Sequence, residues 1–309
     1  MKFPGKETAS LIQKLVKKEV EKMKNKQKIK LVAFLIGKSE ESLSFVKIKA
    51  QVAKKVNIDF ELIHQKKTPF FEKFMRQIKQ KSIDDKSTGL IIQQPLPAQL
   101  STNSIYNCID IEKEIESHKD KSPFTPPIGL AVLTVLKYIY GKNTISRNLI
   151  VDIEKDKLFF KNVFRRKKIV LIGRGITGGE PIGKTLTNVK INYFAINSKT
   201  PSSEIYIKEA DLIITAVGKK VLYPEILKQG VVLINVGLRR ENGKLKGDYD
   251  EKEIKDIASF YTTTPNGIGP IDTLYLYKNL LLAAKLQKIV KKYGKKAIRN
   301  YRSDRKWKN

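Results

Sequence analysis

Residues 169–181, IVLIGRGITGGEP, decide the fold class of this chain more than any other stretch. An apolar run leads directly into a glycine-rich turn, and the helix-like segment IGKTLTN follows at residues 182–188. Glycine has no Cβ atom, so backbone N–H groups in such a turn can approach an anion, and a following helix N-terminus favours negative charge. The spacing differs from G-x-G-x-x-G, so the turn alone fits a plain strand-to-helix connection as well as a dinucleotide phosphate site.

Three more β-branched runs follow the turn, at residues 190–196, 211–218 and 230–237. Short apolar runs separated by helical or loop segments are typical of parallel strands that are buried on both faces. In a doubly wound sheet the ligand lies at the carboxyl ends of the strands. The residues near these ends are Arg174, Ser198, Val217 and Leu238. Because these strand ends meet at one edge, the pattern favours a nucleotide site over a plain α/β core.

The composition limits the class of protein. A chain of 309 residues with 41% hydrophobic content can fill two medium-sized cores and is not generally disordered. No apolar run reaches the roughly 20 residues of a membrane span, and residues 1–10 lack the apolar core of a signal peptide, so we expect a cytoplasmic protein. The single cysteine, Cys108, excludes an internal disulfide and fits a small buried hydrophobe. His64 and His118 show no metal-ligand spacing.

The net charge of +30 raises the question of a nucleic-acid partner. Clustered basic residues bind polyanions through counterion release. The lysines here are spread over nearly every predicted helix without a recognition motif, which favours a solvated lysine-rich surface. Only residues 291–309 combine basic residues with aromatic ones, namely Tyr293, Tyr301 and Trp307, and this tail leaves an unspecific nucleic-acid contact open.

The first half of the chain shows a βαβαβ pattern after a helix near residues 7–23. We expect strands and helices in alternation at residues 30–37, 42–56, 60–66, 70–81 and 89–97. Phe45 and Lys49 are four residues apart and therefore share one helical face. Pro95 cannot continue a central ladder, so it leaves Gln93 near the end of the third strand, where sites form. Taken alone, Lys49 fits a snorkelling lysine and Gln93 a loop-anchoring amide.

Together, and in this order, these features resemble the bifunctional methylenetetrahydrofolate dehydrogenase and methenyltetrahydrofolate cyclohydrolase family over nearly the whole chain. Family members carry a glycine, a serine, a tyrosine and a lysine at spacings that are matched here by Gly37, Ser42, Phe45 and Lys49. The family's VQLPLP is similar to IQQPLP at residues 92–97, which contains Gln93.

The second half extends this resemblance. The family's GRS turn with its later glycine and proline is similar to Gly173, Arg174, Gly175, Gly179 and Pro181, and its HS-x-T is similar to Asn197, Ser198, Lys199 and Thr200. Its VGINR and NGK-x-x-GD resemble VGLRR and ENGKLKGD at residues 236–248, which include Leu238. Its PGGVGPMT resembles PNGIGPID at residues 265–272, which includes Gly267, Pro270 and Asp272.

The resemblance implies a two-domain α/β fold. Residues 1–140 would form a catalytic folate-binding domain to which residues 271–309 return, and residues 141–270 would form a Rossmann-like NADP-binding domain. It also implies two reactions in one cleft between the domains: oxidation of 5,10-methylenetetrahydrofolate with NADP, and hydrolysis of the methenyl product to 10-formyltetrahydrofolate. One-carbon metabolism, purine biosynthesis and a homodimer belong to the same expectation.

The resemblance also assigns roles to residues. Lys49 would move protons during hydrolysis, Gln93 would orient it or the water, and Phe45 would lie beside the substrate. Glu116, Gly267, Pro270 and Asp272 would contact the folate. The cofactor side would comprise Gly173, Arg174, Gly175, Gly179, Ser198, Thr200 and Leu238. Arg174 and Ser198 suit a 2′-phosphate, and no acidic residue follows residues 190–198, which favours NADP over NAD.

Some residues depart from the family pattern or keep a second interpretation. Ser198 also fits a cap for a short helix after Pro201, and Thr200 is equally open. The family's tyrosine is Phe45, and its KDVDG corresponds to residues 113–117 with Glu116 in place of aspartate.

Two further departures bear on the function. Asp272 replaces a threonine, and residues 141–166 form an insertion that we expect to be a surface strand or hairpin. The alternatives are a dehydrogenase without cyclohydrolase activity and an inactive relative that binds nucleic acid.

Overall fold

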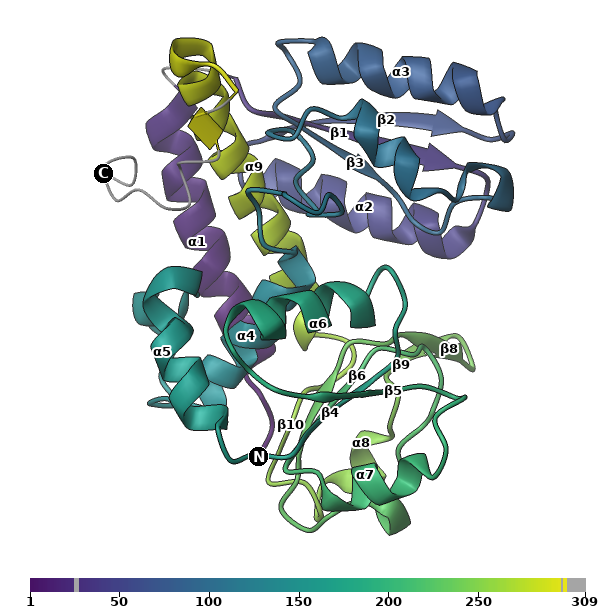
Figure 1. Cartoon of the computed structure of the whole chain (residues 1–309), viewed down its shortest axis with the longest axis vertical. Helices are drawn as coiled ribbons and strands as arrows, with labels where there is room; N and C mark the ends of the chain where they lie inside the picture. The colour runs from purple at the N-terminus through teal and green to yellow at the C-terminus, as the bar shows by residue number, and fades with distance from the viewer. Residues whose placement is uncertain (25–27, 296, 299–309) are drawn as a thin grey trace. The chain divides into compact units, whose positions relative to one another are not determined.

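The computed structural model describes residues 1–24, 28–295 and 297–298 (Figure 1). The chain divides into two compact units, one of Gln13–Pro126 with Leu276–Asn309 and the other of Met1–Ile12 with Pro127–Tyr275. We call them the three-stranded unit and the five-stranded unit after their main sheets. Two of the boundaries fall inside helices α1 (Gly5–Lys24) and α9 (Ile268–Tyr293). The predicted two-domain α/β fold, with a last helix that returns to the first domain, is confirmed, and the domain limits at residues 140 and 270 stay predictions.

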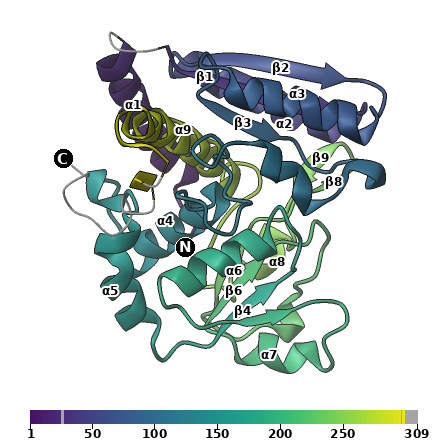
Figure 2. The ribbon, with the colours of Figure 1, turned by 45° about the horizontal axis from the view of Figure 1, so that its top comes forward.

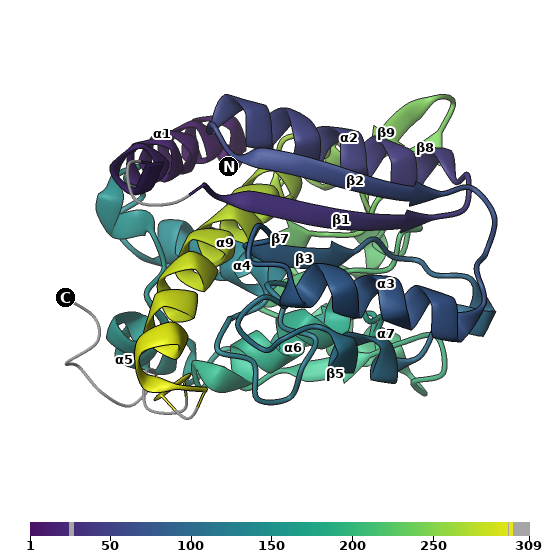
Figure 3. The same ribbon diagram turned by 90° about the horizontal axis from the view of Figure 1, so that it is seen from above.

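The three-stranded unit contains a parallel sheet of order β2-β1-β3, formed by Asp59–Gln65, Lys30–Ile36 and Gly89–Ile92. Helices α2 (Glu40–Lys55) and α3 (Phe71–Ile83) lie on opposite faces of this sheet, as Figure 1 and Figure 3 show. The central strand β1 is buried from Leu31 to Ile36, as expected for a strand covered on both faces.

Strand β3 is shorter than the sequence indicates. The backbone N–H of Gln93 still donates to Phe34 O at 2.9 Å, but Pro95 and Pro97 have no N–H to continue the ladder. The short helices η1 (Ala98–Leu100) and η2 (Asn103–Cys108) follow. The chain then returns beside β3, where Leu90 N donates to Lys113 O at 2.8 Å. This return brings residues 113–118 next to the end of β3.

The five-stranded unit contains a parallel sheet of order β10-β7-β6-β4-β5. Its strands are Phe260–Tyr261, Val232–Asn235, Leu212–Thr215, Ile169–Ile172 and Phe194–Ile196. Helix α6 (Gly179–Asn188) lies on one face and α7 (Ser203–Glu209) on the other (Figure 1, Figure 2). The unit also includes α4 (Pro127–Tyr140), α8 (Glu251–Ile254) and the hairpin of β8 (Arg239–Glu241) with β9 (Lys244–Lys246). Strand β5 begins at Phe194 rather than at Lys190, because Lys190 has φ +63° in the turn after α6.

The expectation of a strand or hairpin at residues 141–166 is wrong. The segment contains η3 (Arg147–Leu149) and helix α5 (Ile153–Phe164). Asp152 caps α5 by accepting from Glu154 N at 3.1 Å and Lys155 N at 3.2 Å. Phe160 and Phe164, four residues apart on the helix, are both buried, so one face of α5 joins the core.

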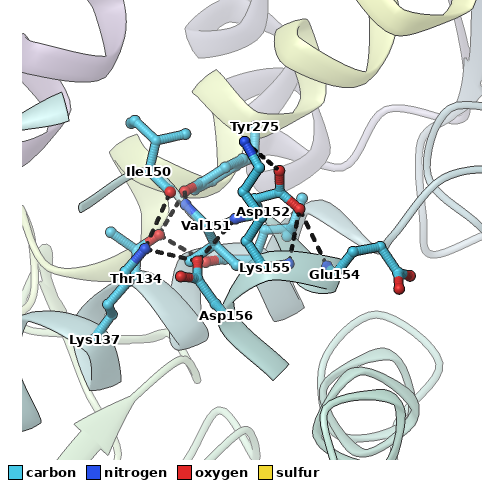
Figure 4. A network of polar contacts seen from close by, with 10 residues as sticks. Thr134, Lys137, Ile150, Val151, Asp152, Glu154, Lys155, Asp156 and Tyr275 are labelled. Atoms are coloured by element: carbon cyan, nitrogen blue, oxygen red, sulfur yellow. Dashed lines mark hydrogen bonds and ion pairs between the residues drawn. The ribbon is translucent and has the colours of Figure 1, made fainter. Parts of the chain in front are cut away.

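A polar network attaches the start of α5 to α4 and α9 (Figure 4). The Tyr275 hydroxyl accepts from Val151 N at 3.2 Å and lies 2.6 Å from the Thr134 hydroxyl. Lys137 Nζ donates to Asp156 Oδ2 at 2.6 Å and lies 3.4 Å from Ile150 O. These contacts attach the start of α5 to Thr134 and Lys137 of α4 and to Tyr275 of α9.

Three further expectations from the sequence concern membrane spans, Cys108 and the basic tail. No helix among the described ranges is both long and apolar enough to cross a membrane. Cys108 is partly buried against the core of the three-stranded unit, with its Sγ 3.4 Å from Met75 Sδ. In the basic tail, Tyr301 and Trp307 lie outside the described residues.

Candidate functional site

The end of β3 and the middle of α2 place Lys49 against Gln93. Ser39 caps α2 by accepting from Ser42 N at 3.3 Å, and Glu40 and Glu41 complement the positive helix N-terminus. The Lys49 ammonium donates to Gln93 Oε1 at 2.9 Å, and the Lys49 side chain is only 14% exposed. The snorkelling interpretation of Lys49 is therefore wrong, since its ammonium lies inward on a buried amide.

The other end of the Gln93 amide is fixed as well. Its Nε2 donates to Gln94 O at 2.7 Å, which leaves Oε1 free to face Lys49. Gln94 Nε2 donates to the Tyr106 hydroxyl at 2.8 Å, and Gln94 Oε1 accepts from Leu96 N at 3.0 Å. Burial, together with the nearby Glu116 carboxylate, raises the pKa of Tyr106, so this phenol stays neutral at physiological pH.

Glu116 supplies the negative charge in this region. Its Oε1 lies 3.8 Å from Lys49 Nζ, and its Oε2 lies 3.8 Å from His118 Nε2. Burial alone would raise the pKa of Glu116, but Lys49 and His118 outweigh it and the pKa is lowered. Glu116 is therefore a carboxylate at neutral pH. The His118 ring stacks on Tyr106 with centroids 4.1 Å apart and an interplanar angle of 17°.

These contacts form a closed ring of residues that includes Lys49. In order it runs through Lys49, Gln93, Gln94, Tyr106, His118 and Glu116 and back to Lys49, and we call it the Lys49 ring. Two of its members, Lys49 and Gln93, were predicted as catalytic residues and Glu116 as a substrate contact. Gln94, Tyr106 and His118 were missed. The proximity of His118 to Glu116 in the sequence was the available signal.

The segment that carries Glu116 is anchored beneath the ring. The Glu114 carboxylate is buried and accepts from Glu116 N at 3.0 Å and Lys119 N at 3.3 Å. Burial raises the pKa of Glu114 despite these donors. Asn279 of α9 donates to Ile115 O at 2.8 Å. Helix α9 thereby positions a loop that has little regular structure.

Phe45 lies one helical turn before Lys49 on α2 and is half-buried. The i to i+4 relation that the sequence predicts is present. The Tyr277 hydroxyl donates to Lys49 O at 2.6 Å, so α9 also fixes this part of α2. Phenylalanine provides an apolar ring beside Lys49 and no hydroxyl.

In the five-stranded unit, the turn after β4 requires its glycines. Gly173 has φ +103°, and a Cβ atom there would lie 2.5 Å from Ala216 O. A Cβ on Gly179 would lie 2.0 Å from Gly173 O, so neither position accepts a side chain. Gly175 O accepts from the N–H groups of Gly178 and Glu180 at 3.1 Å each, which closes the turn at the start of α6. This is the tight geometry that a phosphate-binding turn needs.

The remaining cofactor candidates occupy neighbouring strand ends. Arg174 is exposed, and its guanidinium donates to Ala195 O on β5. Ser198 is exposed, and Thr200 Oγ1 accepts from Asn197 N at 3.0 Å. The proposed capping role of Ser198 is wrong, because α7 begins at Ser203 and its N-cap residue is Ser202.

Asp248 was missed, although it organises two strand ends. Its carboxylate accepts from Val217 N and Gly218 N at 2.9 Å each, and its own N–H donates to Asn235 Oδ1 at 2.7 Å. Burial raises the pKa of Asp248, although the hydrogen bonds from these two N–H groups act to lower it. A Cβ on Gly237 would lie 2.3 Å from the carboxylate, so Asp248 also requires the glycine before Leu238.

The loop before α9 and the first turns of α9 carry three predicted folate contacts. A Cβ on Gly267 would lie 2.4 Å from Thr263 O, so the loop is closed tightly there. Pro270 and Asp272 follow, half-buried, in the first turns of α9. All three belong to the five-stranded unit, and their contact with folate stays a prediction.

Comparison with known proteins gives two family matches, one in each half of the chain. Residues 3–116 match the tetrahydrofolate dehydrogenase/cyclohydrolase catalytic domain, and residues 159–288 match the NAD(P)-binding domain of the same family. The bifunctional protein FolD of Staphylococcus carnosus is 31% identical over 296 residues, which cover 92% of this chain and 96% of that protein. FolD of Staphylococcus aureus strain N315 is 30% identical with the same coverage.

Solved structures agree with these matches. The bifunctional FolD enzyme from Campylobacter jejuni superposes with a TM-score of 0.80 at 25% identity, covering 93% of this chain and 99% of that one. The Trypanosoma brucei enzyme, solved with NADP cofactor and an inhibitor, gives a TM-score of 0.73 at 22% identity, covers 93% of this chain and 98% of that one, and shows the shared fold. This chain is a member of the tetrahydrofolate dehydrogenase/cyclohydrolase family.

Proposed function

We propose that this protein oxidises 5,10-methylenetetrahydrofolate with NADP and hydrolyses the resulting 5,10-methenyltetrahydrofolate to 10-formyltetrahydrofolate. The observation that carries the proposal is the inward Lys49 ammonium, bonded to Gln93 and facing the Glu116 carboxylate. A cation, a neutral amide and a carboxylate are the groups that proton transfer and recognition of a pterin require.

The two half-reactions make different demands on these residues. NADP, when bound, takes the hydride, and the remaining cation is delocalised over two folate nitrogens. This step needs alignment of the folate and no proton transfer. The half-buried Phe45 offers an apolar surface for the ring system. Glu116, ionised at neutral pH, accepts hydrogen bonds from the pterin amine groups, and it reaches one methylene further than an aspartate would.

Hydrolysis needs proton transfer. The water oxygen bonds the methenyl carbon and one proton is released, while the other ends on N5 as the bond between that carbon and N5 breaks. Lys49 carries the proton between these sites, and Gln93 Oε1 fixes the direction of its amine. The contact from Gln93 Nε2 to Gln94 O prevents the amide from turning over.

The cofactor preference depends on Arg174 and Ser198. Both are exposed beside the end of β5, where NAD-selective sites carry an acidic residue for the ribose diol. We expect Arg174→Ala to raise the Michaelis constant for NADP and to leave that for NAD nearly unchanged. The matched control is Arg147→Ala, an exposed arginine of η3. An unchanged preference for NADP over NAD in the Arg174 variant would assign the phosphate to other residues.

The proposed function is tested with purified protein, 5,10-methylenetetrahydrofolate and either NADP or NAD. We expect reduced cofactor to accumulate, faster with NADP, and 10-formyltetrahydrofolate to follow. Reduction of the cofactor without formation of 10-formyltetrahydrofolate above the buffer rate would favour a dehydrogenase that has lost cyclohydrolase activity. This is the second candidate function, because Phe45 and Glu116 stand in place of the family's tyrosine and aspartate. Salt-sensitive RNA binding without folate turnover would favour the inactive relative instead.

Three further assignments stay predictions from the resemblance and the composition. They are a homodimer, a cytoplasmic location and a supply of formyl groups for purine synthesis. Light scattering of the purified chain tests the first of them directly.

A further inference from the structure

We infer that His118 is a positioning residue for the hydrolysis, acting on Lys49 through the Glu116 carboxylate. The inference rests on the proposed function and concerns a residue for which the family resemblance gives no role. It follows from the geometry of the Lys49 ring, in which one carboxylate is shared between a lysine and an imidazole.

The sharing is symmetrical. Glu116 Oε1 lies 3.8 Å from Lys49 Nζ and Glu116 Oε2 lies 3.8 Å from His118 Nε2. All three side chains are largely buried, with exposed fractions of 14% for Lys49, 22% for Glu116 and 15% for His118. Charges at this depth are weakly screened, so the state of the imidazole alters how strongly the carboxylate attracts the ammonium.

The imidazole is also held in place. It stacks on Tyr106, whose hydroxyl accepts from Gln94 Nε2 at 2.8 Å. Gln94 O in turn accepts from Gln93 Nε2 at 2.7 Å, and Gln93 Oε1 accepts from Lys49. Two paths of contacts therefore lead from Lys49 to the stacked rings. One runs through Gln93 and Gln94 to Tyr106, and the other runs through Glu116 to His118. A movement of His118 affects the carboxylate on one side of Lys49 and the amide on the other.

The charged and titratable groups around His118 come from several elements. Glu116 and the buried Glu114 precede it in the loop, and Glu114 interacts electrostatically with His118. Tyr106 comes from η2, and Lys49 from α2 lies across Glu116. Lys119 follows in the chain, and its ammonium is bonded to Ile109 O. The two carboxylates and the stack favour an imidazole that stays beside Glu116.

The consequence for Lys49 has a definite direction. When His118 draws on the Glu116 carboxylate, that carboxylate attracts the Lys49 ammonium less strongly. Without the imidazole, Glu116 acts on Lys49 alone and stabilises the ammonium. Hydrolysis, which needs Lys49 to exchange protons, should slow and require a higher pH. Hydride transfer needs no such exchange and should change far less.

The test uses His118→Phe, which keeps an aromatic ring on Tyr106 and removes the contact with Glu116. We expect the kcat for hydrolysis of methenyltetrahydrofolate at neutral pH to fall about tenfold, because an opposite charge at 4–6 Å changes a proton equilibrium at least this much. The pH–kcat profile should move to higher pH, and the KM for folate should change much less than kcat. His118→Gln provides a second variant of different shape in case the phenylalanine variant does not fold.

A double-mutant cycle with Glu116→Gln decides whether the effect passes through the carboxylate. We expect His118→Phe to have almost no further effect on hydrolysis in the Glu116→Gln protein. An equal fall in both backgrounds, or an equal fall of dehydrogenase and cyclohydrolase, would overturn the inference and leave His118 a structural residue. Wild-type turnover with an unaffected His118→Phe variant would overturn the inference alone. No wild-type turnover of either folate would overturn the proposed function and the inference together.

Discussion

Replacement of Lys49 by methionine separates the two half-reactions that we assign to this protein. Methionine keeps an unbranched side chain of similar length on α2 and removes the ammonium that donates to Gln93 at 2.9 Å. The backbone contact from the Tyr277 hydroxyl to Lys49 O does not depend on the side chain, so α2 should stay in place. The change therefore tests the ammonium and little else.

Lys49→Met should affect both hydrolysis and stability, because the ammonium transfers protons and also pairs with Glu116. Positioned acid–base groups contribute about 10²–10⁴-fold, so hydrolysis should fall at least about 100-fold, or about 2.7 kcal/mol of barrier. The dehydrogenase should lose far less. The loss of the Lys49–Glu116 pair, which is neither fully exposed nor fully buried, should destabilise the fold by on the order of 1 kcal/mol.

The assay measures both half-reactions on one preparation. Formation of NADPH from methylenetetrahydrofolate reports the first, and loss of methenyltetrahydrofolate absorbance reports the second. The matched control is Lys47→Met, an exposed lysine on the same helix, which should leave both rates and the melting temperature unchanged. If Lys49→Met lowered both activities equally at saturating folate, the proposed division of labour would be refuted.

Three further predictions concern Phe45, Tyr275 and Glu114. Phe45→Tyr should raise the cyclohydrolase kcat about tenfold, roughly 1.4 kcal/mol, and the dehydrogenase kcat less, because the hydroxyl can assist proton transfer; unchanged or lower rates in both assays would mean that the site has adapted to phenylalanine. Tyr275→Phe leaves the buried Val151 N–H without its acceptor and should lower the free energy of unfolding in urea by about 1–3 kcal/mol, whereas the exposed Tyr223→Phe should not; equal stability of the two variants would contradict the network. Burial raises the pKa of Glu114 above its ordinary value of 4.5, so the wild type loses stability as the pH rises from that value to the raised pKa, while Glu114→Gln does not. The stability of this variant relative to wild type should therefore increase as the pH rises above about 4.5, and a relative stability independent of pH would show that burial does not raise the pKa of Glu114.

The strands and the glycine turn were predictable because their signals are local. Continuous apolar runs and a glycine-rich segment identify buried parallel strands and the turn after β4 without any knowledge of distant contacts. The pairing of Lys49 with Gln93 needed the family resemblance, since these residues lie 44 positions apart. The resemblance indicated this long-range pairing, which the periodicity of apolar residues cannot indicate.

Two kinds of feature were missed for physical reasons. The Lys49 ring depends on Tyr106, which lies in the short helix η2, and on His118, which lies in a loop, so no repeat in the sequence indicates which way they face. Helix α5 was missed because residues 141–166 carry no site motif and the family resemblance has no counterpart for them. The cap at Asp152 and the phenylalanines at 160 and 164 are helix signals that became convincing only when their burial was known.

Asp248 illustrates a third limit. Its role is to accept two backbone N–H bonds from the loop after β6, and no sequence pattern shows which carboxylates serve the backbone of another strand end. The sequence predicts the glycine turn after β4, and the structure adds Asp248, a buried carboxyl group that holds the loop after β6.

We expect Lys49, Gln93 and Glu116 to support hydrolysis of a methenyl folate although phenylalanine stands in place of the family's tyrosine. The most direct measurement supplies methenyltetrahydrofolate to the wild-type protein without any nicotinamide cofactor and follows its conversion against buffer alone. We predict hydrolysis well above the buffer rate, with the excess removed by Lys49→Met and kept by Lys47→Met. A wild-type rate equal to that of the buffer would contradict the claim.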